Sequence, residues 1–251
     1  MISQQHPKST SAPVSGYCRD CDKLHYLSAD KAITYCKELM LSLQKFKQLD
    51  FETGTSDPEL STDHLYSDMG GKMFGVLVCE DSDGNEVILK AFSGKFNNRR
   101  TVPGWVPHLF DEAKFNAVIE EGNTGIHPLT AQISGLEKGS PDWKTATAER
   151  RQISLGILAK LYALYEVTNF RQETRSLSGA FRFSKSIPTG TGDCCAPKLL
   201  NFAARNNLKP LGIAEFYLGK ASASGERIEG NFYPPCDDKC APLLGFMLCG
   251  I

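Results

Sequence analysis

The chain has 251 residues, a formal net charge of −1 and 41% hydrophobic residues. A chain of this length can bury a sizeable core without disulfides or metal, and its composition excludes the disordered and fibrous classes. The near-zero net charge excludes a globally basic nucleic-acid-binding protein, so any such binding would need a local patch.

The first sixteen residues are polar and lack the apolar core of a signal peptide, so we predict a flexible tail over residues 1–16. We expect a single domain over residues 17–251. The longest apolar run, residues 241–251, is about half the length that spans a bilayer. We therefore expect a cytoplasmic protein with no membrane partner.

The segment YCRDCDKLHYL carries Cys18 and Cys21 with two residues between them, and His25 follows four residues later. A single C-x-x-C is half of a zinc site and needs partners from elsewhere. We predict Cys18 and Cys21 as a second metal candidate, with a turn carrying two idle thiols as the alternative. Cys36 can join them, although its spacing with the apolar residues around it favours the core.

Residues 28–46 have apolar residues at helical spacing, with Ser28 as a plausible N-cap. Two β-rich runs, Met73–Cys79 and Glu86–Phe92, flank D-S-D-G-N, which predicts a β-hairpin. The loop that follows brings together basic and aromatic residues, a pattern that can pair phosphates and stack on bases. These nucleic-acid-binding candidates are Lys95, Arg99, Arg100 and Trp105. The alternative is a solvated loop with a core tryptophan.

Residues 111–122 predict a short helix that Asp111 caps and that stops near Gly122. A longer helix is predicted over residues 143–170, and residues 171–192 read as a loop. A helix over residues 196–206 capped by Asp193, a buried strand and a proline-opened helix over residues 241–249 complete the chain. We therefore predict an α/β or α+β fold with a mixed sheet, a hairpin and packed helices.

Two cysteine segments precede the last two helices: G-T-G-D-C-C-A-P and Y-P-P-C-D-D-K-C-A-P. Unpaired N–H groups and the partial positive charge of a helix start favour thiolates, which bind zinc. We predict a Zn²⁺ site in the C-terminal part, about residues 184–251. Its candidate ligands are Cys236, Cys240 and either Cys194 or Cys195, since adjacent residues rarely point at one ion. Three sulfurs would leave an open fourth position.

Free core thiols are the first alternative. A nucleophilic cysteine is the second, and it would need a histidine partner that the spacing does not select. The histidines are His6, His25, His64, His108 and His127.

The order of these segments resembles zinc nucleobase deaminases, whose signature is His or Cys, a glutamate two residues on, and a later P-C-x-x-C. The C-terminal part is therefore expected to be a three-layer, deaminase-like arrangement. Two departures stand out. The second pair is C-x-x-x-C, and Ala196 stands where the glutamate is expected after Cys194. Asp193 or Glu215 are the candidates to replace that glutamate as catalytic residues.

Several phrases also resemble the N-terminal extension of bacterial RluA-type pseudouridine synthases. They are GKMFGVLVC, LKAFSGKF, PGWVPHLFD, GTGDCCAPKLLNFAARNNLKPLGIAEFYLG and FYPPCDDKCAPLLGFML, which together cover most of the chain from about residue 70. The resemblance implies Cys194, rather than Cys195, as ligand beside Cys236 and Cys240, with Asp193 beside the ion. The H-R-L-D motif of the catalytic domain is missing, so we expect a stand-alone accessory domain and not a complete pseudouridine synthase.

The resemblance implies a zinc-binding accessory domain of RNA modification that binds or acts on RNA. Its expected partners are RNA and a pseudouridine synthase or other RNA-modifying protein. Fold association alone does not fix function. A zinc-dependent deaminase-like hydrolase and a structural zinc module for protein contacts are therefore the alternatives.

Overall fold

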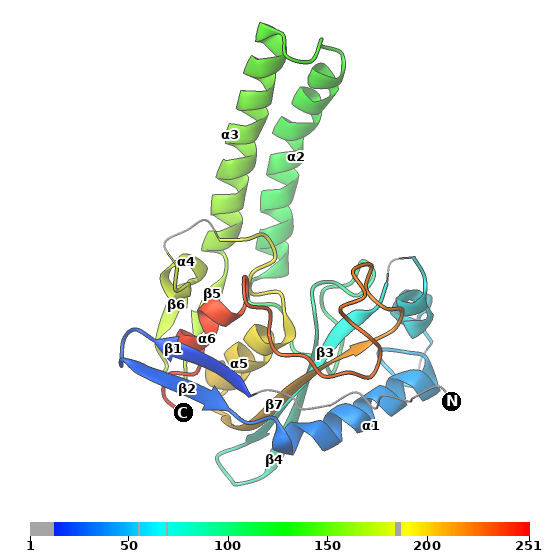
Figure 1. Ribbon diagram of the computed structural model, residues 1–251, viewed down its shortest axis with the longest axis vertical. Helices are drawn as coiled ribbons and strands as arrows, with labels where there is room; N and C mark the ends of the chain where they lie inside the picture. Colours follow the sequence, from blue (N-terminus) through cyan, green and yellow to red (C-terminus); the bar gives the residue numbers. More distant parts are fainter. Residues whose placement is uncertain (1–12, 55, 69, 184–186) are drawn as a thin grey trace, which may run out of the picture.

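The computed structural model describes residues 13–54, 56–68, 70–183 and 187–251 (Figure 1). Helices and strands are mixed in it, which confirms the predicted α/β or α+β class. The strands are β1 (Val14–Cys18), β2 (Lys23–Leu27), β3 (Lys72–Glu80), β4 (Glu86–Phe92), β5 (Glu166–Thr168), β6 (Thr174–Ser176) and β7 (Lys209–Leu218). The helices are α1 (Asp30–Phe46), α2 (Glu112–Ser134), α3 (Pro141–Ala163), α4 (Leu177–Ala180), α5 (Cys195–Arg205) and α6 (Ala241–Met247), with short 3-10 turns at Pro58–Leu60 and Thr62–Tyr66.

The central sheet has the order β4-β3-β7, and β3 runs antiparallel to both neighbours. The predicted hairpin forms β3 and β4, and the Asp81 carboxylate closes its turn by accepting from the backbone N–H groups of Asp83 and Asn85. Alternate residues of β3 point to opposite faces. Phe74 packs into a core with α1, and Leu77 packs into a second core with α5. The sheet is thus the middle of three layers.

The β1–β2 hairpin lies against α6, so the first described residues contact the last helix (Figure 1). Two glycines permit this contact. A Cβ added at Gly245 would lie 1.9 Å from the carbonyl oxygen of Tyr17, and one added at Gly16 would lie 2.2 Å from the backbone nitrogen of Gly245. Backbone therefore packs directly on backbone where the hairpin meets the helix.

Helices α2 and α3 form an antiparallel pair that extends from the body as an arm (Figure 1). The predicted stop near Gly122 is wrong, because α2 continues to Ser134. Gly122 and Gly125 face α3 and make room for Ile157 and Ile153, whose side-chain atoms lie 3.0 and 3.4 Å from where a Cβ would stand. The glycines serve close helix packing rather than helix termination.

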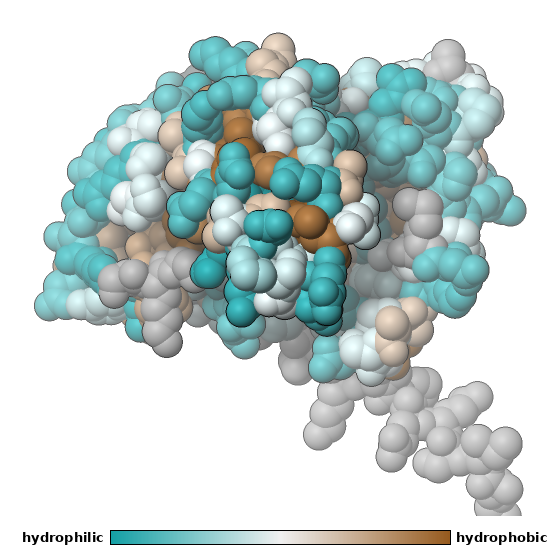
Figure 2. Space-filling view, turned by 90° about the horizontal axis from the view of Figure 1, so that it is seen from above, coloured by the Kyte–Doolittle hydropathy of each residue, from teal (hydrophilic) through white to brown (hydrophobic). Residues whose placement is uncertain are grey.

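Other boundaries also differ from the sequence-based expectation. Residues 14–16 of the predicted tail belong to β1, while residues 1–12 lie outside the described residues. The predicted loop over residues 171–192 contains β6 and α4. Seen from above, the surface is mainly hydrophilic, with hydrophobic residues in small separate patches (Figure 2). In the part of the chain described, none of the helices combines the length and apolarity needed to cross a membrane.

Gly245→Ala is expected to lower the free energy of unfolding by about 2 kcal/mol or more, because its methyl group would overlap Tyr17 backbone atoms. Gly156→Ala is the matched control, since Gly156 is an exposed helical glycine with no atom within 4 Å of an added Cβ. That change should stabilise the chain by about 0.5–1 kcal/mol. Urea unfolding of both variants measures these changes in the free energy of unfolding. Equal changes in the two variants would contradict the close contact at Gly245.

Candidate metal centres

Three cysteines that the sequence predicted to share a cation lie together in the structure. The sulfur atoms of Cys194 and Cys236 are 3.7 Å apart, and the sulfur of Cys240 lies within 4.8 Å of both. Two sulfurs bonded at about 2.3 Å to one tetrahedral zinc would be about 3.8 Å apart. The observed separation fits a shared ion, and it is too long for a disulfide bond of about 2.05 Å.

The chain on either side of α5 and α6 positions these sulfurs. Cys194 is the N-cap residue of α5, with an extended backbone, and Cys240 directly precedes α6. The backbone N–H groups of Cys240 and Ala241 both donate to the carbonyl oxygen of Cys236, at 3.2 and 3.0 Å. This tight turn folds the C-x-x-x-C segment back on itself. Its two sulfurs therefore meet Cys194 despite the additional residue.

The three thiols do not ionise alike. Hydrogen bonds from the thiols of Cys194 and Cys240 lower the pKa of Cys236, and the backbone N–H groups of Cys240 and Lys239 add to this effect. The hydrogen bond to Cys236 raises the pKa of Cys194. Hydrogen bonds with Cys194 and Cys236 likewise raise the pKa of Cys240. These hydrogen bonds therefore favour a thiolate at Cys236, and a bound metal would favour thiolates at the other two sulfurs.

Cys195, the alternative ligand, faces the sheet instead. Its thiol donates to the carbonyl oxygens of Met73 and Ala91, at 3.4 and 3.6 Å. The residue is fully buried, and burial raises the pKa of its thiol well above the ordinary value. Cys194 is therefore the member of the adjacent pair that joins the sulfur group.

Glu215 of β7 reaches the same helix start. Its Oε1 accepts a 2.9 Å hydrogen bond from the backbone N–H of Ala196, a donor that has no partner within the helix. Gly75, its partner in β3, provides the room, because a Cβ there would lie 2.7 Å from Cβ of Cys195. Burial raises the pKa of Glu215 to about 7, against the opposing effect of the Ala196 N–H. The carboxyl group can therefore exchange a proton near neutral pH.

Asp193, the other predicted catalytic residue, does not belong to the group of sulfur ligands. Its Oδ1 accepts a 3.0 Å hydrogen bond from the hydroxyl of Tyr165 and lies 3.6 Å from Nδ1 of His108. The predicted N-cap role of Asp193 is wrong, because Cys194 occupies the N-cap of α5. Burial lowers the pKa of His108, and the Asp193 carboxylate opposes this effect. The hydrogen bond from Tyr165 thus holds Asp193 in place, and His108 lies close to it without a hydrogen bond.

Lys198 is a further titratable group at the start of α5, and the sequence analysis missed it. Its ammonium group is buried, donates to the carbonyl oxygen of Phe92 at 2.6 Å and lies 4.5 Å from the centre of that ring. Burial lowers the pKa of Lys198 to about 8. Several strongly perturbed groups around one helix start are characteristic of functional sites.

A second group of four candidate ligands contains Cys18, Cys21, His25 and Cys249, with ligand atoms within 4.8 Å of one another. The sulfur of Cys21 is 3.0 Å from Nε2 of His25 and 3.6 Å from the sulfur of Cys249. Cys249 was missed because no local spacing connects it to residues at the other end of the chain. Cys36 does not join this group, since its thiol donates to the carbonyl oxygen of Ala214 in the core.

The pKa shifts in the second group also favour the protonation states that bind a cation. Burial tends to raise the pKa of Cys18, but the backbone N–H groups of Cys21 and Asp20 and the neighbouring thiols outweigh this effect and lower it. Burial lowers the pKa of His25, assisted by two nearby positive charges. A thiolate and a neutral imidazole are the forms in which these side chains bind metal.

The proposed nucleic-acid-binding residues do not form one surface. Trp105 is buried and donates its indole N–H to the carbonyl oxygen of Leu49 at 3.0 Å, so it cannot stack on a base. Arg100 is mostly covered, and its guanidinium lies 3.7 Å from Glu112 and over the ring of Phe115. The alternative of a core tryptophan in a solvated loop describes this segment better.

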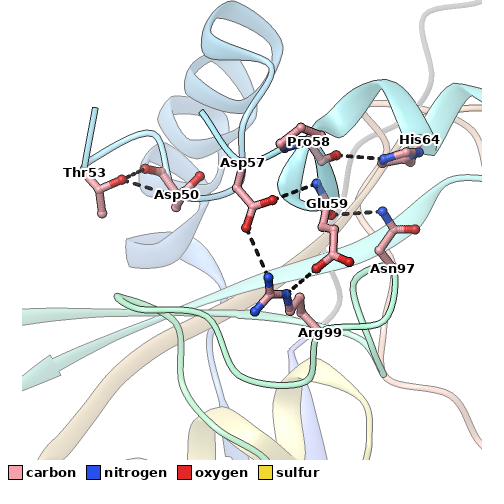
Figure 3. Close-up of polar contacts among 8 residues, drawn as sticks. All are labelled: Asp50, Thr53, Asp57, Pro58, Glu59, His64, Asn97 and Arg99. Atoms are coloured by element: carbon pink, nitrogen blue, oxygen red, sulfur yellow. Dashed lines mark hydrogen bonds and ion pairs between the residues drawn. The ribbon is translucent and has the colours of Figure 1, made fainter. Parts of the chain in front are cut away.

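Arg99 is neutralised within the protein (Figure 3). Its Nε donates to Glu59 at 2.5 Å, and a terminal nitrogen lies 3.4 Å from Asp57. Asn97 of the same loop donates to the carbonyl oxygen of Glu59 at 3.0 Å. Of the four predicted residues, Lys95 alone is exposed without such a cover.

No protein-family model, curated protein or solved structure matches the chain.

The buried Lys198 gives the stability of the fold a defined pH dependence. Its pKa is near 10.5 when exposed and about 8 in the fold. Between these values the unfolded chain binds more protons, so Lys198 makes the free energy of unfolding rise with pH. Urea unfolding measures the free energy of unfolding of the wild type and of Lys198→Met. Between pH 7 and 10.5 this free energy should rise in the wild type relative to the variant by on the order of 3 kcal/mol. The exposed Lys138→Met is the control, and a constant difference would contradict the expectation.

Proposed function

We propose that this chain is a zinc-dependent domain in which Cys194, Cys236 and Cys240 hold a catalytic ion for hydrolytic, deaminase-like chemistry linked to RNA modification. Thiolate ligands favour zinc over hard cations. Within the described residues the sulfur group has three members, and catalytic zinc sites keep a fourth position free. Cys194 and Cys236 are partly exposed, so this centre is not sealed in the core.

The position of Glu215 is the observation that carries the proposal. In the deaminase signature the proton-carrying glutamate stands two residues after the first ligand. Here residue 196 is alanine, and the carboxyl group of Glu215 arrives from β7 to bind the backbone N–H of that same residue. A strand residue thus supplies a buried carboxyl group beside the place where the signature would put one.

The element order supports the same proposal. Helix α5 with a ligand before it, strand β7, and helix α6 with two ligands before it follow one another, and the β3–β4 hairpin stands earlier in the chain, before α2. The sheet order is β4-β3-β7. When bound, zinc lowers the pKa of a water at its free position to about 7. Glu215, buried at the start of α5, would be the group that accepts and returns protons beside such an ion. Asp193, held by the hydroxyl group of Tyr165, would orient the loop that precedes Cys194.

RNA is the substrate class that the resemblance to pseudouridine synthase extensions favours. The same resemblance makes a pseudouridine synthase or another RNA-modifying protein the expected partner. A purely structural zinc module for protein contacts is the alternative at this centre, and it would require a fourth protein ligand.

Cys194→Ser is expected to remove one equivalent of zinc from the purified protein, whereas the adjacent Cys195→Ser should retain it because its sulfur faces the sheet. Elemental analysis of folded variants, checked by circular dichroism, measures this contrast. In the cobalt-substituted protein, azide should alter the visible spectrum by entering the free position. Equal zinc loss in both variants, or a spectrum that azide leaves unchanged, would contradict an open three-cysteine centre.

Glu215→Gln is expected to retain zinc and RNA binding while losing ammonia release from RNA or free nucleosides by a factor of about 10² or more. Glutamine still offers an oxygen to the Ala196 N–H, but its amide group neither accepts nor releases a proton near neutral pH. Filter binding at rising salt measures RNA affinity, which should fall with ionic strength if phosphates are bound. An unchanged rate of ammonia release would rule out the catalytic role, and salt-independent or absent binding would rule out RNA as partner.

A further inference from the structure

The β1–β2 hairpin has too little core of its own to explain its fixed position. Three of its strand residues are buried: Val14, Cys18 and Leu27. Leu24 and Tyr26 are 68% and 69% exposed, although both are large and hydrophobic. An isolated two-stranded hairpin is marginal in water, and small elements of this kind are commonly held by a metal or a disulfide.

The ligand atoms at the end of this hairpin have the separations of a metal shell. The sulfurs of Cys21 and Cys249 are 3.6 Å apart, close to the roughly 3.8 Å expected for two sulfurs on one zinc. Disulfide-bonded sulfurs would be about 2.05 Å apart. Three sulfurs and one imidazole are a ligand set found in structural zinc sites.

We propose that Cys18, Cys21, His25 and Cys249 form a closed structural zinc site that fastens the β1–β2 hairpin to the end of α6. Four protein ligands complete a tetrahedral shell and leave no position for a substrate. Neighbouring contacts also connect the hairpin to α6. Asp20, in the turn between the strands, pairs with Arg175 at 3.0 Å, and that guanidinium lies over the ring of Phe246.

The closed site also bears on the three-cysteine centre through α6. Cys240 directly precedes this helix, and Cys249 follows it by two residues. Nine residues of near-helical chain span roughly 14 Å, so the two groups of ligands lie at opposite ends of one short rigid element. An ion at the closed site would fix the far end of α6 and thereby the placement of Cys240.

Zinc content tests the closed site without reference to any enzymatic activity. The wild-type chain should contain about two zinc ions, and His25→Ala should contain about one. His25→Cys should restore the second ion, because a fourth sulfur can replace the imidazole. His64→Ala is the matched control, since His64 is a half-buried histidine that contacts the carbonyl oxygen of Pro58 and lies in neither group. A folded His25→Ala chain with unchanged zinc content would overturn the proposal.

Cys194→Ser provides an independent arm if His25→Ala does not fold. This variant should keep one ion, and its cobalt form should show a tetrahedral spectrum that azide does not change. Loss of all zinc from folded Cys194→Ser would overturn the closed site, as would a Cys21–Cys249 disulfide found by peptide mapping of the wild type. A wild-type chain with a single zinc that survives Cys194→Ser would support the closed site and contradict the three-cysteine centre, so the two proposals fail separately.

Discussion

The close approach of α5 to the central sheet at Gly75 is the constraint on which the three-cysteine centre depends. A side chain at this position would overlap Cβ of Cys195 and displace the start of the helix. The same space admits the carboxyl group of Glu215 to the backbone N–H of Ala196. Because Gly75 has no side chain, α5 can pack close to the central strand β3. The distance between the helix and the sheet in turn determines the position of Cys194.

Around this contact the protein keeps groups that a core selected only for stability would avoid. The ammonium group of Lys198 and the carboxyl group of Glu215 both lose their hydration when they are buried. For each group, a hydrogen bond to the backbone compensates for only part of this cost. Apolar side chains of similar volume would avoid this cost of desolvation. The groups gather where the sulfurs also converge, which is where an active site would need proton-exchanging groups in a low dielectric.

The sequence predicted those parts of the structure whose signal is local. The β3–β4 hairpin was predicted from its turn residues. The two similar cysteine segments predicted that Cys236 and Cys240 meet one member of the adjacent pair, and the family resemblance implied that this member is Cys194. Other parts depend on distant neighbours and had no local signal. Gly122 was predicted to end its helix because the sequence does not show that it packs against Ile157. Similarly, nothing in the spacing of Cys249 connects it to the hairpin. His108 could not be selected among five histidines until Asp193 was seen beside it.

The two ligand groups differ in the chain entropy that their assembly must overcome. Cys194 and Cys236 are 42 residues apart, whereas Cys21 and Cys249 are 228 residues apart. Closure entropy grows by about 0.6 kcal/mol for each doubling of loop length, which makes the longer closure costlier by roughly 1.5 kcal/mol. The intervening body must already be folded for the longer loop to close at little further cost. The hairpin is thus expected to join the folded body late, and an ion at its site would then fix the far end of an α6 that already packs against α5.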